Sequence, residues 1–307
     1  MESLKIAIVG SGAVGCHYGG LLHRAGHEVH FLLRGDLDAV RAKGIHLRGP
    51  EGDVHLYPVR AAGNPNEIGP CDLVIISLKA TSNADLPKLV PPLLRENTRL
   101  LTLQNGLGNE EFLAEHFGKE RVMGGICFVT LNRVEPGVVR NFNPGYIKVG
   151  EPFGNPGDRA EETAALFADA GVRCRVASSL MEARWRKLCW NIPFNGLAIA
   201  GGGIDTAAIL ADDGLSGLTR ELMEETRAVA ASLGHAIEDE FLDKQISQTL
   251  PMGPYKPSSL IDYLEGREIE IEAIWGEAWR TARRQEVETP RLGMLYRLIQ
   301  SLARSRG

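Results

Sequence analysis

Two groups of residues in this sequence have the types and the spacing to do chemistry. The first is the segment Gly10–Gly15, in which glycines stand at the first, third and sixth positions directly after an apolar run. The second is a polar stripe of Lys187, Asn191 and Asn195, which recur every four residues. The glycine segment has the form of a loop that holds phosphate groups. An ammonium with two carboxamides suits an anionic or carbonyl-bearing small molecule.

The glycine segment lies between a predicted strand at 6–9 and a predicted helix at 13–25, which is the context that a dinucleotide-binding loop requires. In such a loop Gly10 permits the tight turn, Gly12 lets the backbone approach a pyrophosphate, and Gly15 lets helix and strand pack closely. The N–H groups of the first helical turn then face the anion. The remaining members of the predicted cofactor loop are Ser11, Ala13 and Val14. The alternative is a glycine-rich turn without function.

The residue that follows the second predicted strand, 29–33, indicates which dinucleotide binds. NAD-binding chains usually carry an acidic residue there for the ribose hydroxyls. This chain has Arg34, 22 residues after Gly12, and a guanidinium can grip a 2′-phosphate with two hydrogen bonds. The sequence therefore favours NADP, the alternative being an exposed arginine without a ligand. Asp36 is near enough to contact the ribose, but its position favours the N-cap of the next helix.

The polar stripe falls in a segment with helical character. On a helix, Lys187, Asn191 and Asn195 drift by only ~80° while the helix rises ~12 Å, so they share one side. Large apolar residues flank them, and polar groups in such surroundings need hydrogen-bonding partners. The alternative is an ordinary solvated helix face. Pro193 lies inside the segment and is predicted to kink the helix.

The elements that must position these residues divide the chain into two parts. Short apolar runs alternate with helical patterns up to about residue 150, which predicts right-handed crossovers and a parallel sheet. We expect an α/β Rossmann domain at 1–177 and an all-α domain at 178–307. The predicted strands are 6–9, 29–33, 73–77, 100–103, 122–129, 137–141, 146–149 and 172–176. Of these, 122–129, 137–141 and 146–149 are expected to extend the same sheet as hairpins. The predicted helices are 13–25, 83–90, 109–117, 158–170, 179–199, 213–234, 236–250, 259–265, 268–285 and 290–304.

Composition excludes several classes of function. The chain has 307 residues and a net charge of −5, which argues against nucleic-acid binding. No apolar run is long enough for a membrane span. Five scattered cysteines without a CxxC pair predict a reducing compartment, so the cytoplasm is expected. Four histidines near the first crossover (His17, His23, His27 and His30) lack metal-ligand spacing, and no metal is expected.

With three further groups of motifs, these features resemble the ketopantoate reductase family (2-dehydropantoate 2-reductase) over nearly the whole chain. The additional motifs, in order, are Ser77-Leu-Lys79-Ala, Gln104-Asn105-Gly106-Leu-Gly108, and a cluster of Pro257-Ser258-Ser-Leu-Ile-Asp262, Gly266-Arg267 and Glu270-Ile-Glu272. The resemblance implies a Rossmann domain joined to a helical domain of the 6-phosphogluconate dehydrogenase type, with the active site in the cleft between them. It also implies reduction of ketopantoate to pantoate by NADPH, a step towards pantothenate and coenzyme A.

The resemblance assigns roles to individual residues. Gly10–Gly15 and Arg34 would bind NADP, and Lys79 and Asn105 would lie near the ribose and nicotinamide, with Asn105 also facing the substrate. Lys187 resembles the catalytic lysine, and Glu270 the carboxylate near the reaction centre. The residues that resemble substrate ligands are Asn191, Asn195 and Ser258. Taken without the resemblance, Lys79 is also compatible with a solvated lysine, Asn105 with a turn residue, and Glu270 with a solvated face.

The sequence also departs from the family pattern. Gly196 follows the second asparagine of the stripe, where the family often has Pro or Ala. Asp205 stands where some members carry a substrate-binding asparagine, and a carboxylate would repel an anionic substrate. Ser258 aligns as the substrate ligand, whereas Ser259 forms a capping-box-like pattern with Asp262.

Three functions follow from these observations. The leading one is reduction of ketopantoate, a small 2-keto acid. The second, motivated by Asp205, is reduction of another branched 2-keto acid. The third is a non-catalytic NADP-binding sensor, which the joint presence of Lys187, Asn191 and Asn195 disfavours. A homodimer is compatible with each of them.

Overall fold

The computed structural model describes residues 2–154 and 157–305 and divides into two compact units. The first unit contains Met1–Gln104 and Asn109–Leu180, and the second contains Asn105–Gly108 and Met181–Gly307. The sequence placed one boundary after residue 177, whereas the main division here follows Leu180. The short segment Asn105–Gly108, from the middle of the chain, is counted with the second unit.

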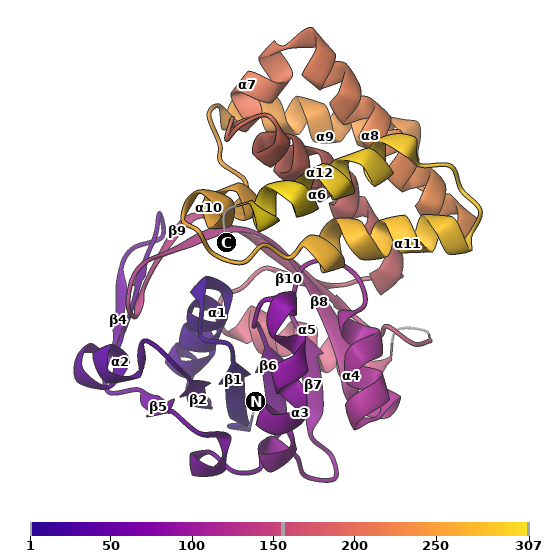
Figure 1. Cartoon of the computed structure of the whole chain (residues 1–307). Helices are drawn as coiled ribbons and strands as arrows, with labels where there is room; N and C mark the ends of the chain where they lie inside the picture. The colour runs from indigo at the N-terminus through magenta and orange to yellow at the C-terminus, as the bar shows by residue number, and fades with distance from the viewer. Residues whose placement is uncertain (1, 155–156, 306–307) are drawn as a thin grey trace. The chain divides into compact units, whose positions relative to one another are not determined.

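The first unit is built on a twisted sheet that has ten strands in the described part of the chain, in the order β4-β3-β9-β8-β7-β6-β1-β2-β5, with β10 also paired to β9 (Figure 1). The strands are β1 Lys5–Val9, β2 Glu28–Leu32, β3 Ile45–Arg48, β4 Val54–Leu56, β5 Arg60–Ala62, β6 Leu73–Ile76, β7 Arg99–Thr102, β8 Val122–Glu135, β9 Val138–Gly150 and β10 Cys174–Val176. The central strands β2, β1, β6, β7 and β8 are parallel, so the predicted Rossmann sheet is confirmed.

Alternation along β1 explains why helices cover both faces of this sheet. Ile6 and Ile8 belong to a core with α1 and α5, whereas Ala7 and Val9 belong to a second core with α3 and α4. Both sets are fully buried, which is why the strand is a continuous apolar run. The helices of this unit are α1 Ala13–Arg24, α2 Leu37–Lys43, α3 Leu86–Leu89, α4 Asn109–Phe117 and α5 Asp158–Asp169, with short 3-10 turns η1 Pro65–Glu67, η2 Ala80–Asp85, η3 Pro91–Leu93 and η4 Lys119–Arg121.

Strands β8 and β9 form a long antiparallel hairpin that turns at Gly137. The predicted hairpin extension of the sheet is confirmed, although 137–141 and 146–149 belong to one strand rather than two. The other edge of β9 pairs with β3 at residues 138–140 and with β10 at 147–149. Residues 141–146 lie between these two pairings.

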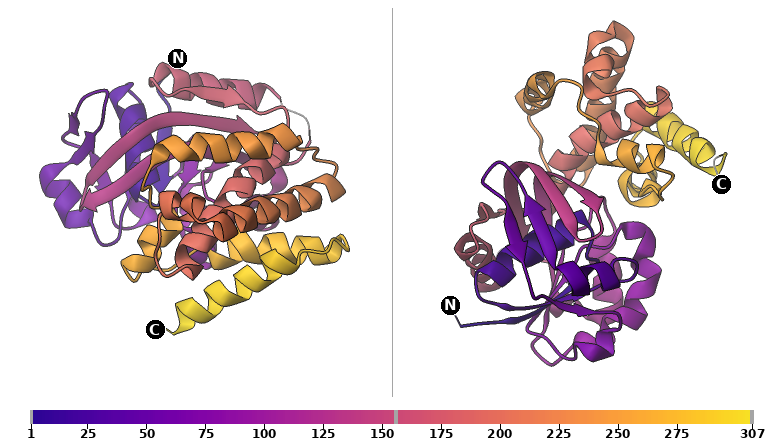
Figure 2. Two further views of the ribbon diagram at one scale, coloured as in Figure 1. Left: turned by 90° about the horizontal axis from the view of Figure 1, so that it is seen from above. Right: turned by 90° about the vertical axis from the view of Figure 1, so that its left-hand side faces the viewer.

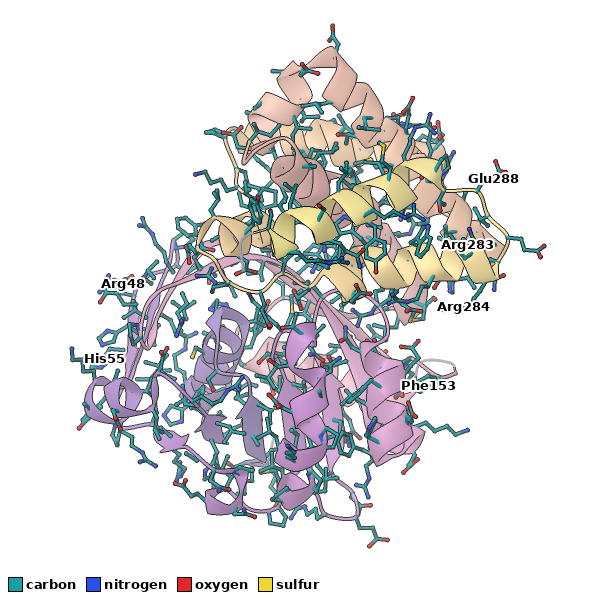
Figure 3. The ribbon with its side chains drawn as sticks, in the orientation of Figure 1. Arg48, His55, Phe153, Arg283, Arg284 and Glu288 are labelled. Atoms are coloured by element: carbon teal, nitrogen blue, oxygen red, sulfur yellow. The ribbon has the colours of Figure 1, made fainter. Side chains whose placement is uncertain are left out.

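The strands β3, β4 and β5 were not predicted from the sequence, and the helix expected after Asp36, α2, was given no range. These strands have three or four residues each and carry His and Arg, so they lack the apolar run that marks a buried strand. Figure 3 shows Arg48 and His55 of the β3–β4 hairpin on the outer surface.

The second unit is helical, as predicted. Its helices are α6 Leu180–Ala200, α7 Thr206–Ala211, α8 Asp213–Ser232, α9 Asp239–Thr249, α10 Ser258–Leu264, α11 Glu277–Arg284 and α12 Pro290–Arg304, with a 3-10 turn η5 Leu250–Met252 and a π-helical segment η6 Glu272–Gly276. Helix α8 packs against α7, α9, α11 and α12 (Figure 2). The sequence predicted one helix over 268–285, but residues 268–270 are not helical, and the helical structure there consists of η6 and α11.

Helix α6 supplies much of the core of this unit and continues through Pro193. Trp275 is fully buried in the same core and donates a hydrogen bond from Nε1 to the Ile192 carbonyl oxygen at 3.0 Å. A Cβ atom on Gly196 would lie 2.6 Å from Leu295 and 2.9 Å from Trp275 Nε1. The glycine at 196 therefore makes room for a tryptophan and for helix α12.

No helix in the described ranges is long and apolar enough to cross a membrane. The five cysteines are free, and four of them are buried while Cys174 is half-buried. Burial raises the pKa of the Cys16 and Cys189 thiols to about 12, so both stay protonated and act as small apolar groups.

Candidate active site and cofactor loop

The glycine loop in the first unit has the local geometry of a dinucleotide cradle. Gly10 has a φ of +102°, and a Cβ there would lie 2.3 Å from the Leu78 backbone nitrogen. A Cβ on Gly15 would lie 2.3 Å from the Gly10 carbonyl oxygen. A Cβ on Gly12, in contrast, would meet nothing within 4 Å. Two glycines thus allow close backbone packing, and the third leaves open the side from which a pyrophosphate approaches.

Two side-chain hydrogen bonds hold this loop. Ser77, which follows β6, donates from its hydroxyl to the Gly10 carbonyl oxygen at 2.8 Å. Ser11 donates to the Leu32 carbonyl oxygen at the end of β2 at 3.1 Å. The N-cap of α1 is Gly12, which has no side chain to satisfy the first N–H groups of the helix. These donors suit an anionic ligand, so the loop fits the phosphates of a dinucleotide.

Arg34 lies two residues after β2 with its side chain 75% exposed, and its Nη1 is 3.5 Å from a carboxylate oxygen of Asp85. An ion pair in such an exposed position is weak, so the guanidinium can engage an incoming phosphate. Asp36 occupies the N-cap position of α2, as the sequence favoured, but its side chain makes no capping hydrogen bond. Its carboxylate pairs instead with Arg133 of β8. Lys79 is half-buried at the N-cap position of η2.

The predicted polar stripe lies on one continuous helix, α6, in the second unit. Asn191 is 7% exposed, Asn195 is 1% exposed, and Lys187 is half-buried. The alternative interpretation, an ordinary solvated helix face, is therefore wrong.

The Lys187 amine has a defined partner in the segment Asn105–Gly108. Its Nζ donates a hydrogen bond to Asn105 Oδ1 at 2.6 Å, within the second unit. Arg184, which is 3% exposed, donates from Nη1 to the Gly106 carbonyl oxygen at 3.0 Å. The Leu107 N–H donates to the Ala273 carbonyl oxygen at 2.8 Å. Gly106 has a φ of +83°, and a Cβ there would lie 2.4 Å from that same oxygen.

Asn105 is thus more than a turn residue, because its side chain orients the candidate catalytic amine. Arg184 was not among the site residues predicted from the sequence. This arginine stands one turn before Lys187 in the run Arg184-Trp-Arg-Lys187, and nothing in the residue types tells which of the three cations is buried.

The two asparagines of the stripe differ in what they contact. Asn195 donates from Nδ2 to the Asn191 carbonyl oxygen at 3.1 Å and accepts the Ser259 N–H at 2.9 Å. It therefore ties the start of α10 to α6. The Asn191 carboxamide makes no hydrogen bond to any residue of the described chain, although it is largely buried. A buried amide without a protein partner is suited to bind a ligand.

The predicted capping box at Ser259 is wrong. Pro257 occupies the N-cap position of α10, Ser259 lies inside the helix, and Asp262 pairs with Arg267 at 2.9 Å. Ser258, at the first position of the helix, is exposed.

Glu270 and Asp205 complete the predicted site residues. Glu270 is 9% exposed and precedes the π-helical segment, so Glu270 itself does not lie on a solvated face, although Glu268 and Glu272 of the same run are exposed. Asp205 is the N-cap of α7, and its carboxylate accepts the Ala208 N–H at 2.9 Å. This capping contact gives Asp205 a structural role. Among the residues that the structure describes, no three His, Cys, Asp or Glu side chains are grouped to hold a metal ion.

Comparison with known proteins agrees with this geometry. The family model described as "Ketopantoate reductase PanE/ApbA" matches residues 6–153, and its C-terminal counterpart matches residues 179–303. The chain belongs to the ketopantoate reductase family.

Individual members of the family are similar over nearly their full length. A 2-dehydropantoate 2-reductase of Nostoc sp. is 38% identical, with 98% of this chain and 96% of that protein covered. The crystal structure of a 2-dehydropantoate 2-reductase from Geobacter metallireducens has a TM-score of 0.94 at 45% identity and covers 96% of this chain and 99% of its own. A second crystal structure, from Methylococcus capsulatus, has a TM-score of 0.89 at 33% identity, with 98% and 97% covered.

Proposed function

We propose that this protein reduces 2-dehydropantoate to pantoate with NADPH, with Lys187 as the general acid. The observation that carries the proposal is the Lys187 Nζ to Asn105 Oδ1 hydrogen bond, which fixes an ammonium at one end of a buried polar stripe. A relative 38% identical over almost the whole chain bears the name of this activity. The product belongs to the synthesis of pantothenate and coenzyme A, as the family resemblance implies.

NADPH, when bound, supplies the hydride. In the proposal, Gly10–Gly15 hold the pyrophosphate through backbone N–H groups, because this loop combines open space at Gly12 with a helix start that no side chain caps. Arg34 binds the 2′-phosphate, and Lys79 and Asn105 contact the ribose and nicotinamide end.

Hydride transfer to a ketone builds negative charge on its oxygen. The Lys187 ammonium stabilises that charge and donates a proton to the oxygen, since an ammonium is both a cation and an acid. Asn105 orients the amine, and Glu270 is the proposed carboxylate that orients Lys187 further or returns its proton. Asn191 and Ser258 hydrogen-bond the substrate, and Asn195 holds Ser258 in place through the neighbouring Ser259 N–H.

Asp205, like Asn195, is a predicted substrate ligand that this proposal does not place against the substrate. Its carboxylate caps α7 through the Ala208 N–H, so it is directed at its own backbone. Asp205 was the reason to consider a different 2-keto acid substrate, and this contact weakens that reason. We further propose that the protein works in the cytoplasm as a homodimer.

The decisive experiment is an NADPH-oxidation assay with ketopantoate beside a panel of other branched 2-keto acids. We expect ketopantoate to give a kcat/KM at least tenfold above every other acid in the panel. A higher kcat/KM for another acid would show that this acid, and not ketopantoate, is the substrate. Tight NADPH binding without NADPH oxidation in the presence of any of the acids would favour the non-catalytic NADP-binding sensor.

A further inference from the structure

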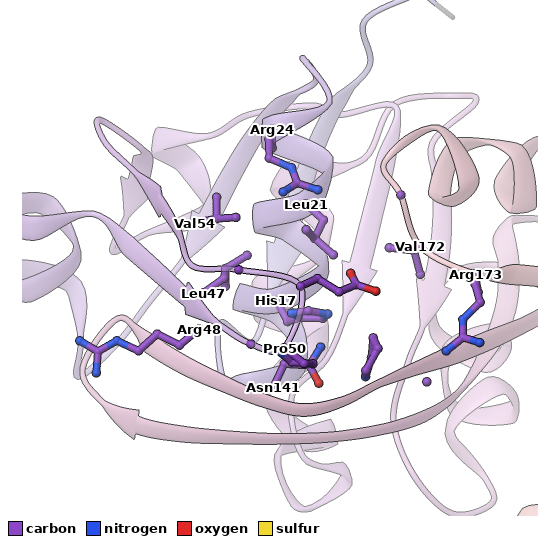
Figure 4. A pocket seen from close by; sticks show the side chains of 16 residues that line it. His17, Leu21, Arg24, Leu47, Arg48, Pro50, Val54, Asn141, Val172 and Arg173 are labelled. Carbon is purple, nitrogen blue, oxygen red and sulfur yellow. The ribbon is translucent and has the colours of Figure 1, made fainter.

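We propose that the first unit carries a second binding site, for a small anion that bears a hydroxyl group. The site is a cavity of about 150 Å³ formed by α1, the β3–β4 hairpin, β9 and the residues just before β10 (Figure 4). Its lining starts on α1 at His17 and includes none of the residues Gly10–Gly15. The volume suits a small molecule and is too small for a dinucleotide.

The sheet itself creates this cavity. On one edge of β9, the pairing with β3 ends at Arg140 and the pairing with β10 begins at Ile147. Asn141, Pro144 and Gly145 of the intervening stretch line the cavity. Pro144 has no backbone N–H, so this stretch is poorly suited to accept another strand. The gap between β3 and β10 is therefore a fixed feature of the edge, open to a ligand.

Two polar atoms of the lining are buried without a hydrogen bond in the described part of the chain. They are His17 Nδ1 and Asn141 Oδ1, and the His17 side chain as a whole is only 7% exposed. Leaving such atoms unpaired is unfavourable, so a ligand that pairs with them gains binding free energy. A hydroxyl group can donate to an amide oxygen and also bond to an imidazole nitrogen. Burial beside Arg24 lowers the pKa of His17 to about 4, so this histidine is a neutral partner.

The charges around the cavity select an anion. Three arginines (Arg24, Arg48 and Arg173) and one carboxylate (Glu51) line it, a surplus of two positive charges. None of the three guanidinium groups makes an ion pair or side-chain hydrogen bond with any residue in 2–154 or 157–305. In Figure 4, Arg48 points away from the other labelled side chains, whereas Arg24 lies over Leu21 towards His17. Arg24 and Arg173 are therefore the proposed anion ligands, and Arg48 is a matched control.

The ligand class is a small hydroxylated carboxylate or phosphate, and thermal unfolding of the full chain saturated with NADP⁺ tests it. The probes are malate, succinate (which lacks the hydroxyl) and inorganic phosphate, each compared with sodium chloride at equal ionic strength. We expect a saturable rise in Tm that is larger with malate than with succinate. A larger rise with phosphate than with malate would assign the site to phosphate compounds.

Variants connect this effect to the cavity. R24Q combined with R173Q should raise the malate concentration needed for half of the Tm rise more than tenfold, whereas R48Q should leave it within twofold. N141L keeps all charges and should remove the difference between malate and succinate. K187A should retain the full effect, which separates this site from the proposed active site. Absence of a saturable rise with all three probes, or an equal rise in the double arginine variant, would overturn the proposal.

Discussion

The glycine loop before α1 and the polar stripe on α6 prepare for their ligands in different ways. The loop offers backbone N–H groups, and its shape depends on residues without side chains, because Gly10 and Gly15 permit contacts that a Cβ would forbid. The stripe offers side chains, and two of the three are held by segments far away in the sequence: Lys187 by Asn105, and Asn195 by Ser259. A backbone site is therefore sensitive to added atoms, and a side-chain site to removed ones.

The largest expected effect comes from removing the amine of the stripe. Lys187→Ala should lower kcat with ketopantoate by a factor of about 100 or more, as is usual when a general acid is lost. Lys244→Ala, an exposed lysine on α9 of the same unit, is the matched control. Steady-state kinetics of both variants measure this effect. If the Lys187 variant keeps most of its kcat, Lys187 is not the general acid.

Low pH should lower the free energy of unfolding of the first unit, because His17 on α1 is buried there. Burial lowers the pKa of this histidine from 6.5 to about 4, so the unfolded chain binds more protons than the folded chain between these values. The free energy of unfolding should be unaffected by His17 above about pH 6.5 and fall by about 3 kcal/mol as the pH drops to 4.

Urea unfolding of the wild type and His17→Gln across that pH window measures this loss. The substitution should flatten the dependence, whereas His116→Gln, at an exposed position on α4, should not. Parallel curves for the wild type and the His17 variant would contradict the assignment.

Two alanine substitutions within the loop should separate folding from cofactor binding. Gly15→Ala places a Cβ 2.3 Å from the Gly10 carbonyl oxygen and should lower the free energy of unfolding by roughly 1–3 kcal/mol. Gly12→Ala meets no atom within 4 Å and should cost about 1 kcal/mol or less, yet raise the KM for NADPH about tenfold by filling the pyrophosphate approach. Thermal unfolding and NADPH kinetics on both variants test this; equal behaviour of the two would refute the distinct roles of these glycines.

The same separation applies to the two asparagines of the stripe. Asn195→Ala leaves the buried Ser259 N–H without an acceptor and should lower the free energy of unfolding by about 1–3 kcal/mol. Asn191→Ala breaks no hydrogen bond of its carboxamide and should instead raise the KM for ketopantoate about tenfold at unchanged Tm. A large Tm loss in the Asn191 variant with normal KM would reverse the two roles.

The smallest effect concerns the choice of dinucleotide. Arg34→Ala should reduce the preference for NADPH over NADH by about tenfold, because a surface guanidinium to phosphate contact contributes little more than 1 kcal/mol. Arg41→Ala on α2, about half exposed and paired with Glu67, serves as the control. If the ratio of the two kcat/KM values does not move, the 2′-phosphate is held elsewhere.

The sequence alone was informative wherever a pattern is local. The loop follows from glycine spacing after an apolar strand, and the stripe follows from the four-residue recurrence of Lys187, Asn191 and Asn195. Contacts between distant segments were out of reach: no local pattern shows that Asn195 is bound to Ser259, that Arg184 rather than Arg186 is buried, or that Asp205 caps a helix. The short strands β3, β4 and β5 were also missed, because their pairing comes from the sheet and not from their own three or four residues.

The assignment of Asn105–Gly108 to the helical unit means that the backbone passes from one unit to the other three times, after Gln104, Gly108 and Leu180. A gene fragment that starts at Met181 would therefore produce a helical unit without the acceptor of its key amine. A longer linker inserted at residue 180 would leave the two other connections between the units, after Gln104 and after Gly108, unchanged. In this chain the helical unit is not an independent module, because the segment Asn105–Gly108 belongs to it although both flanking segments of the chain belong to the first unit.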